Sequence, residues 1–231
     1  PKLSVNASLR YEDVNDKTPI LPYFTVGLGS TSTFNGNNEP HSFRTTSGKL
    51  EASYALPMAF RLTGGLGYEE KKHNFSPVRV VTHRDKTEET SYRVELRRSM
   101  SATVTGALAY IHSERDGPPF MLTTLNNGTI ALSGNRVAPM NIADRDRDKV
   151  RLSVNWTPAE PLSLQFAVDE ARDSYGQIHA LGTGVRKGEA RNYSVDAAYT
   201  FSDQWQGTAW VSRNDTRQDQ TQHVGTGTAG L

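Results

Sequence analysis

The feature that most constrains the fold is a strict alternation of apolar and polar residues on both sides of a tight turn. Residues 49–56 alternate, the chain turns at Pro57 and Met58, and residues 60–69 alternate again. The apolar positions are Leu50, Ala52, Tyr54, Leu56, Phe60, Leu62, Leu66 and Tyr68. A period of two is typical of β-strands with one apolar and one polar face. The pattern therefore predicts an antiparallel strand pair.

The same pattern returns along the chain, with tight turns and long hydrophilic segments in alternation. The predicted strands are residues 2–11, 49–56, 60–69, 92–97, 102–110, 150–156, 162–168, 193–201 and 205–213. Tight turns are expected at residues 57–58, 99–100, 157–161 and 202–204, and long loops at residues 12–47, 70–89, 112–148 and 171–189. Pro158 and Pro161 exclude the third turn from the sheet interior, because proline has no ladder donor.

Short turns at one end of the strands and long loops at the other are typical of an outer-membrane β-barrel, with turns in the periplasm and loops outside. Strands of about ten residues also match a tilted crossing of the hydrocarbon core. The sequence predicts an all-β fold, an antiparallel transmembrane barrel in a Gram-negative outer membrane, with residues 1–231 as a single barrel segment. Bacterial barrels usually have an even number of strands, so nine strands are expected to be part of a larger barrel.

Composition agrees with this fold and excludes several other classes. Only 35% of the residues are hydrophobic, which would permit disorder, but regular alternation argues against it, and a barrel has a polar lumen and polar loops. The sequence has no run of about 18 apolar residues, so we expect no transmembrane helix, and we expect no signal peptide in this chain. Pro1 is not a natural start, so we expect a mature chain that is a piece of a longer one. The absence of cysteine excludes thiolate metal sites, disulfides and covalent haem attachment.

Aromatic residues are expected to form two bands, one at each membrane interface. At the loop ends of the predicted strands lie Tyr11, Tyr68, Tyr92, Tyr110 and Tyr193, and at the turn ends lie Phe60, Trp156, Phe201 and Trp205. Two such girdles are typical of membrane barrels. Strands favour aromatic residues at any position, which is the alternative explanation.

The polar face of the strands is the candidate functional surface. The residues predicted to face the lumen or a partner are Ser53, Thr63, Gly65, Gly67, Arg93, Glu95, Arg97, Thr103, Thr105, Arg151, Ser153, Asn155, Ser194 and Asp196. Most are small, and the charges among them are of both signs, whereas a solute-selective pore would carry a ladder of one sign. A wall of small side chains suits the close approach of a large rigid body. A wide aqueous porin would explain a polar lumen equally well, so both interpretations stay open.

A second candidate is a strip of alternating charge where the third loop meets the sixth strand. It consists of Asp144, Arg145, Asp146, Arg147, Asp148 and Lys149. The strip is either a salt-bridged strand end, in which each exposed pair is worth less than about 1 kcal/mol, or a docking surface for a partner.

Signals for catalysis and metal binding are weak. The histidines, which are His41, His73, His83, His112, His179 and His223, fall in or beside predicted loops and have no spacing that builds a site, so we expect them to be solvated. The sequence contains no nucleophile elbow and no phosphate-binding glycine loop. We expect no enzyme activity, and a net charge of +1 predicts no nucleic-acid partner.

Five segments resemble the MtrB/PioB family. They are Tyr11–Pro19, Leu50–Pro57, Thr90–Arg97, Asn141–Lys149 and Arg191–Tyr199, and their order along the chain matches as well. The resemblance implies an outer-membrane barrel that sheathes a periplasmic multihaem c-type cytochrome and so carries electrons across the membrane. It also implies outer-membrane lipid and a further extracellular multihaem cytochrome at the loops as partners, and no cofactor of its own.

The chain departs from the family in two respects. The family's barrels are much longer, and the CxxC pair of some members is absent, so no redox role of that pair is carried over. The family offers no catalytic residues to transfer. The alternatives to the sheath are a general diffusive porin and a soluble β-rich adhesin or binding module.

Overall fold

The computed structural model describes residues 2–19, 21–25, 33–37, 41–74, 83–121, 139–176 and 184–221. These residues form one antiparallel sheet of nine strands and a separate two-stranded sheet. The strands of the large sheet are β1 (Leu3–Val14), β4 (Ser42–Ala55), β5 (Phe60–Asn74), β6 (Lys86–Ser99), β7 (Val104–Asp116), β8 (Arg145–Ala159), β9 (Leu162–Tyr175), β10 (Gly184–Ser202) and β11 (Trp205–Thr221). The predicted all-β fold and its nine antiparallel strands are thus confirmed.

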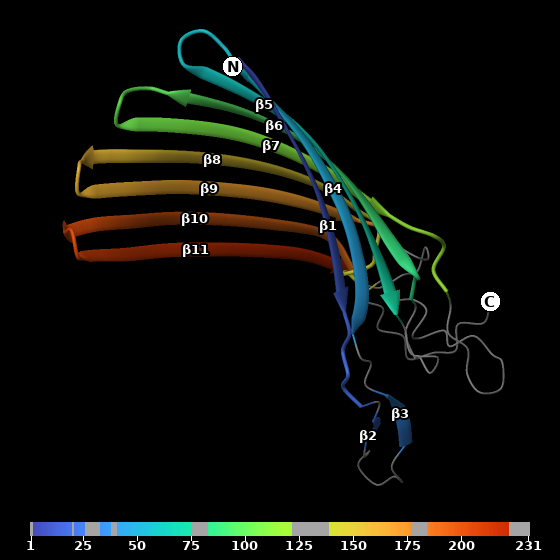
Figure 1. Ribbon diagram of the computed structural model, residues 1–231. Coiled ribbons are helices and arrows are strands. Elements are labelled where there is room, and N and C mark those ends of the chain that lie inside the picture. Colours follow the sequence, from blue (N-terminus) through green and yellow to red (C-terminus); the bar gives the residue numbers. More distant parts are fainter. Residues whose placement is uncertain are drawn as a thin grey trace.

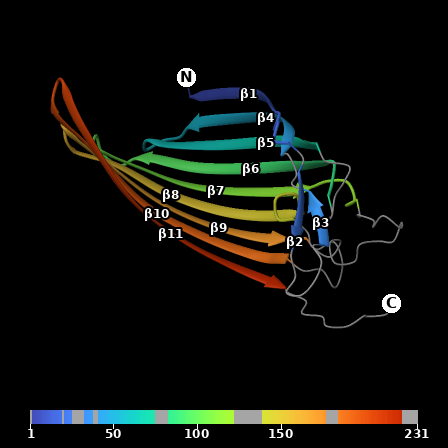
Figure 2. The ribbon, with the colours of Figure 1, turned by 90° about the horizontal axis from the view of Figure 1, so that it is seen from below.

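The nine strands follow one another in chain order, each beside the next, as a continuous meander. Figures 1 and 2 show that the sheet is curved, with β1 and β11 at its two edges. The small sheet pairs β2 (Pro22–Thr25) with β3 (Thr33–Asn37). It lies in residues 12–47, so the prediction of one long loop there was wrong in part.

Turns and loops alternate as predicted. Short connections of residues 56–59, 100–103, 160–161 and 203–204 join β4 to β5, β6 to β7, β8 to β9 and β10 to β11. In Figure 1 these turns lie at one end of the sheet and the longer connections at the other. We call these the turn end and the loop end; by the rule for outer-membrane barrels they face the periplasm and the outside.

The turn between β4 and β5 has an unusual composition. Met58 and Ala59 have φ angles of 57° and 59°, in the left-handed region, and the backbone N–H of Leu56 donates to the carbonyl of Phe60 at 2.8 Å. Two central residues with positive φ match the twist of a hairpin, and Asn-Gly is the usual choice. Here Met58 and Ala59, which lack that preference, adopt positive φ angles.

The strands are longer at the loop end than the alternation predicts. β4 begins at Ser42 rather than 49, β5 runs to Asn74 rather than 69, and β10 begins at Gly184 rather than 193. The apolar alternation stops at the tyrosines, but the backbone ladder continues with charged residues on both faces. The alternation therefore marks only the part of each strand that faces hydrocarbon.

At the turn end, β8 extends through part of the predicted turn 157–161. Its pairing with β9 passes from Trp156 opposite Leu164 to Ala159 opposite Leu162, and the intervening residues form an irregularity. Pro158 lies in that irregularity, so it avoids the regular ladder as expected.

The sheet is a single layer whose apolar face is open. Leu50, Leu66, Leu108 and Leu152, near the centre of that face, are 48–53% exposed. Only Ala109, Ile142 and Ala143 form the buried hydrophobic set of the described residues. A continuous apolar surface of this kind requires a nonpolar environment. No helix in the described part of the chain is long and apolar enough to span a membrane.

Candidate functional site: the polar face of the sheet

The strand register gathers the small polar residues of different strands on one face. Ser53 lies opposite Thr63, which lies opposite Glu95, and the hydroxyls of Ser53 and Thr63 are hydrogen-bonded at 2.7 Å. Thr105 and Asn155 lie opposite each other in the same way on β7 and β8. Ser53 and Thr63 are half-buried although they are small, whereas leucines on the apolar face are exposed. The polar face is thus the more enclosed one, as the inside of a curved sheet should be.

Glycines on β5 leave the polar face without side chains between β4 and β6. Gly65 lies between Glu51 and Arg93, and a Cβ there would lie 3.3 Å from Cγ of Glu51. A Cβ on Gly67 would lie 2.4 Å from Oγ of Ser91, so that a larger residue requires the serine to rotate. On β8, Ser153 lies between Ala107 and Ala167. These positions leave room above the backbone on the polar face.

Most charges on the polar face are paired within the chain. Arg151 donates through Nε and Nη2 to both carboxylate oxygens of Asp169, at 2.6 and 3.0 Å, and Nζ of Lys149 lies 3.3 Å from the same carboxylate. Arg93 is hydrogen-bonded to Glu95 on its own strand. Ser194 and Asp196 face the same side on β10 and lie opposite Ala167 and Gln165. The paired charges do not form the one-sign ladder of an ion-selective pore.

Thr103 is an exception among the predicted wall residues. It lies in the turn before β7, which starts at Val104, and not in the strand. The Ser101 hydroxyl accepts hydrogen bonds from the backbone N–H groups of Thr103 and Val104, at 3.2 and 3.0 Å. This local side-chain contact competes with the sheet ladder and delays the start of the strand.

The strip of alternating charge is divided between the two faces of the sheet. Residues 145–149 belong to β8, so successive side chains point to opposite faces. Arg145, Arg147 and Lys149 share the polar face, while Asp146 and Asp148 share the apolar side with Tyr110 and Trp156.

The strip makes several contacts within the chain. On the polar face Arg145 donates to Glu89 at 2.8 and 2.9 Å, and Arg147 donates to both oxygens of Asp173 at 2.6 and 2.8 Å. Asp144, which precedes the strand, accepts from Arg84 at 2.6 Å. The contacts correspond to the salt-bridged strand end. Docking of a partner here stays a prediction.

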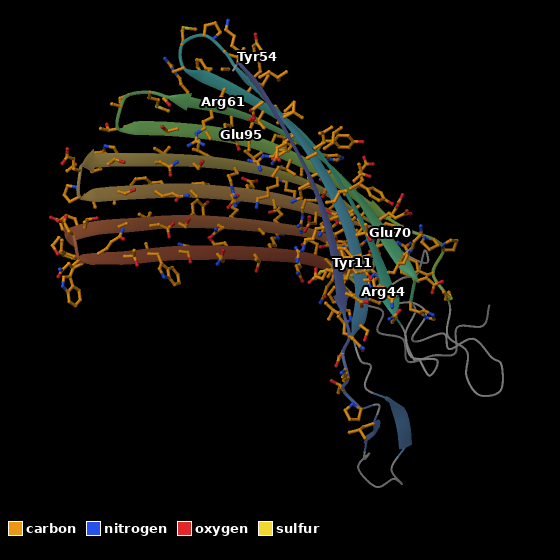
Figure 3. All side chains as sticks on the ribbon, viewed as in Figure 1. Tyr11, Arg44, Tyr54, Arg61, Glu70 and Glu95 are labelled. Atoms are coloured by element: carbon orange, nitrogen blue, oxygen red, sulfur yellow. The ribbon has the colours of Figure 1, made fainter. Side chains whose placement is uncertain are left out.

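The outward tyrosines mark where the apolar face ends. The Tyr68 hydroxyl donates to Glu88 at 2.8 Å, and the Tyr110 hydroxyl donates to Asp148. Figure 3 shows Tyr11 near the loop end with Arg44 and Glu70. Ion pairs follow on the same face beyond the tyrosines, among them Arg44–Asp13 at 3.2 Å. Such exposed pairs belong in water, so the strands continue beyond the hydrocarbon.

The turn end has its own aromatic residues on the same face. The guanidinium of Arg98 lies over the ring of Phe60, 4.7 Å from its centroid, and the rings of Tyr199 and Phe201 meet edge to face at 4.8 Å. Trp156 shares the outward side with Val104 and Leu164. The positions agree with the prediction of two aromatic bands.

The histidines are less solvated than predicted. His73 is buried, with only 8% of its surface exposed, and its ring lies 3.4 Å from the hydroxyl of Thr87. His112 lies in β7 and contacts Asp148 and Glu114 at 2.9 and 3.2 Å. His179 and His223 lie outside the described residues. Among the residues that the structure describes, no group of three or more His, Asp or Glu could hold a metal ion.

One polar cluster at the loop end was not predicted. Arg84 is only 3% exposed, donates to the carbonyl of Ile142 at 3.2 Å and lies over the ring of Phe120, 3.9 Å from its centroid. Arg115 donates to the carbonyls of Met140 and Ala143 at 2.7 and 3.0 Å. Through these hydrogen bonds the two arginines hold residues 140–144 against the loop end of the sheet. Alternation cannot reveal such a cluster, because its members lie partly in loops.

A second connection at the loop end is held by Asp16. Its carboxylate accepts hydrogen bonds from the hydroxyl and N–H of Thr18, at 2.6 and 2.9 Å, and from the N–H of His41 at 2.8 Å. These bonds, with that from the Thr18 hydroxyl the strongest, lower the pKa of Asp16 to about 2. The residue therefore stays ionised and joins the end of β1 to the start of β4 over the physiological range.

The family model described as "Putative outer membrane beta-barrel porin, MtrB/PioB" matches residues 1–231. The chain belongs to the MtrB/PioB family of outer-membrane β-barrel porins. The protein is therefore located in the Gram-negative outer membrane, as predicted. This location does not agree with the alternative of a soluble adhesin. An antiparallel sheet with one apolar face is suited to form part of the wall of such a barrel.

Outer membrane protein MtrB of Shewanella baltica (strain OS185) is 21% identical over 201 residues, which are 87% of this chain. The chain spans 27% of the length of that relative. Among solved structures, Copper transporter OprC aligns with 94% of this chain and 36% of its own, at 12% identity and a TM-score of 0.47.

Proposed function

We propose that this chain is part of a sheath that encloses a periplasmic multihaem c-type cytochrome and holds it for electron transfer across the outer membrane. The observation that supports the proposal most is the polar face, where small residues alternate with charges, most of which are paired within the chain. A wall of small side chains with few unpaired charges permits close approach by a protein, because few such charges would be desolvated.

The family supports the same proposal. A barrel that encloses an electron-carrying cytochrome must shield the cytochrome from water and ions. Its outer face must be compatible with lipid. Ser53, Thr63 and Gly65 stand on the inside, and leucines such as Leu66 stand on the outside of the same strands. We also propose a second multihaem cytochrome at the loop end as a partner, outside the membrane.

The test uses the full-length protein in proteoliposomes. Liposomes that enclose a redox dye are prepared with the protein and its cytochrome together, with the cytochrome alone, and with the protein alone. A reductant that cannot cross the membrane is added outside. We expect rapid reduction of the dye only when both proteins are present. Equal rates with the cytochrome alone would refute the sheath.

The second candidate function is a diffusive porin, which the polar lumen face and the family description favour. Liposome swelling in small sugars, with the full-length protein and no cytochrome, separates the two functions. Rapid swelling that persists when the cytochrome is present supports the porin. Swelling that the cytochrome abolishes supports the sheath, because the cytochrome then fills the lumen.

We further propose that the chain has no catalytic activity and carries no cofactor of its own. The sequence has no cysteine and so offers no thiol for covalent haem attachment, which supports the proposal that the haems are carried by the partner. Absorption spectroscopy of the purified full-length protein, without cytochrome, should show no haem band.

A further inference from the structure

Two arginines on the polar face have an arrangement that the fold alone does not explain. Arg61 and Arg97 lie directly opposite each other on β5 and β6. Like charges directly opposite on one face of an antiparallel pair are destabilising. Neither arginine has an ion pair or hydrogen bond within the described residues.

The contrast with the other arginines of this face makes the pair distinct. Arg145, Arg147 and Arg151 each donate to a carboxylate, and Arg93 is hydrogen-bonded to Glu95. Glu95 is the acid closest in register to the pair, since it is two residues from Arg97 on the same strand and lies opposite Thr63. It is already bound to Arg93, so the pair is left with unmatched positive charge.

The location of the pair adds a second observation. Arg61 is the second residue of β5, at the turn end, and Figure 3 shows it near Glu95 in that part of the sheet. The carbonyl of Lys2 accepts from the N–H of Ala55, which lies opposite Arg61, so a third basic residue joins the same row. The turn end is the periplasmic end of a barrel of this family.

Both arginines are exposed, and small residues surround them. Ala55 lies beside Arg61, and Ala107 lies opposite Arg97 on β7. The guanidinium groups are therefore free to reach into the lumen, where they can donate bidentate hydrogen bonds. Carboxylates match that geometry best.

We infer that Arg61 and Arg97 bind carboxylate groups on the surface of the periplasmic protein that the barrel encloses, at the end where that protein enters. The inference rests on the proposed sheath function. The enclosed protein would then carry an acidic patch, formed by acidic side chains or haem propionates, that contacts the two arginines at the periplasmic end of the barrel.

The test uses the full-length protein, purified from membranes together with its cytochrome. The double variant Arg61→Gln/Arg97→Gln removes the charge, and Arg98→Gln is the matched control, because Arg98 lies at the same end but faces outward over Phe60. Retained haem per barrel is measured as salt is raised. We expect the double variant to bind the cytochrome about ten- to a hundred-fold more weakly, and the control to match the wild type.

A separate measurement distinguishes binding from folding. Removing two like charges should leave the thermal stability of the empty barrel unchanged or raised, whereas a structural role for the pair would lower it. If the double variant is stable and retains the cytochrome as the wild type does, the inference is wrong while the sheath stands. If the wild type itself retains no cytochrome, the sheath and the inference fail together.

The source of the carboxylates is identified with Arg61→Lys/Arg97→Lys. This variant keeps the charge and should restore binding at least in part. Its amines can be coupled to adjacent carboxylates by a carbodiimide. Mass spectrometry then shows whether the linked group is an acidic side chain or a haem propionate. Restored binding with no link at either lysine would contradict direct contact.

Discussion

His73 shows how the environment of a single residue is decided by its strand neighbours. It lies at the loop end of β5, opposite Phe43, beyond the tyrosines and outside the part of the strand that crosses hydrocarbon. Burial, and then the positive charge of Lys71, His41 and Arg115, lowers the pKa of His73 to about 4. The ring is therefore neutral at physiological pH.

This shift predicts a pH dependence of local stability. The pKa of His73 in the folded state is lowered from its ordinary value of 6.5 to about 4, because the fold favours the neutral ring. The fold therefore has its full stability above about pH 6.5, where the ring is neutral in both states. It loses stability as the pH falls toward about 4. The full loss is on the order of 3 kcal/mol. We expect the protection factors of backbone amides at the loop ends of β5 and β6, which correct each exchange rate for its intrinsic dependence on pH, to fall over that interval.

His73→Gln is the control, because glutamine stays neutral. Its protection factors at the loop ends should be flat between pH 6.5 and 4. The same fall in protection in the glutamine variant would mean that another group is responsible.

At the level of the strand, the alternation of apolar and polar residues predicts which face contacts lipid and which faces the lumen. Leu152 and Ser153 are successive residues at the centre of β8 and so point to opposite faces. Leu152 lies between Leu108 and Val168 on the apolar face, whereas Ser153 lies between Ala107 and Ala167 on the polar face.

The pair predicts a sharp difference between two arginine substitutions. Leu152→Arg places a charge in hydrocarbon and should cost about 2–4 kcal/mol of folding stability. Ser153→Arg places the same charge in the lumen, where the small neighbours leave room, and should cost less than about 1 kcal/mol. Urea unfolding of the full-length protein in lipid vesicles measures both. Equal costs would show that the two faces meet the same solvent.

Strand ends show where sequence reasoning works and where it stops. Parity placed Ser53, Thr63 and Asn155 on one face, because alternation is a local property. It did not find that β4 starts at Ser42, since nothing apolar marks a strand above the membrane. It also placed Thr103 in a strand, because the contact of its backbone with the Ser101 hydroxyl leaves no trace in the alternation.

At the scale of the whole molecule, the sheet has two edges. Among the described strands, β1 pairs only with β4 and β11 only with β10. Unpaired backbone groups are costly in hydrocarbon, so we expect both edges to pair with further strands in the membrane.

Proline substitutions in β11 test this requirement. Thr208 and Ala209 are successive, so their N–H groups point to opposite sides of the strand, one toward β10 and the other toward the open edge. If a further strand pairs with β11 in the full-length barrel, Thr208→Pro and Ala209→Pro should both lower its resistance to SDS at room temperature. A wild-type result for one of the two would mean that β11 is an edge.

The sequence by itself determined the strands, the order of turns and loops, and the solvent of each face, because all of these follow from a repeat of two along the chain. Only the tertiary structure decided which charges are neutralised. Arg151 and Asp169 are 18 residues apart but form a bidentate pair, whereas Arg61 lies opposite another arginine. Register is a relation between strands, so a local pattern cannot reveal which cations are left for a partner.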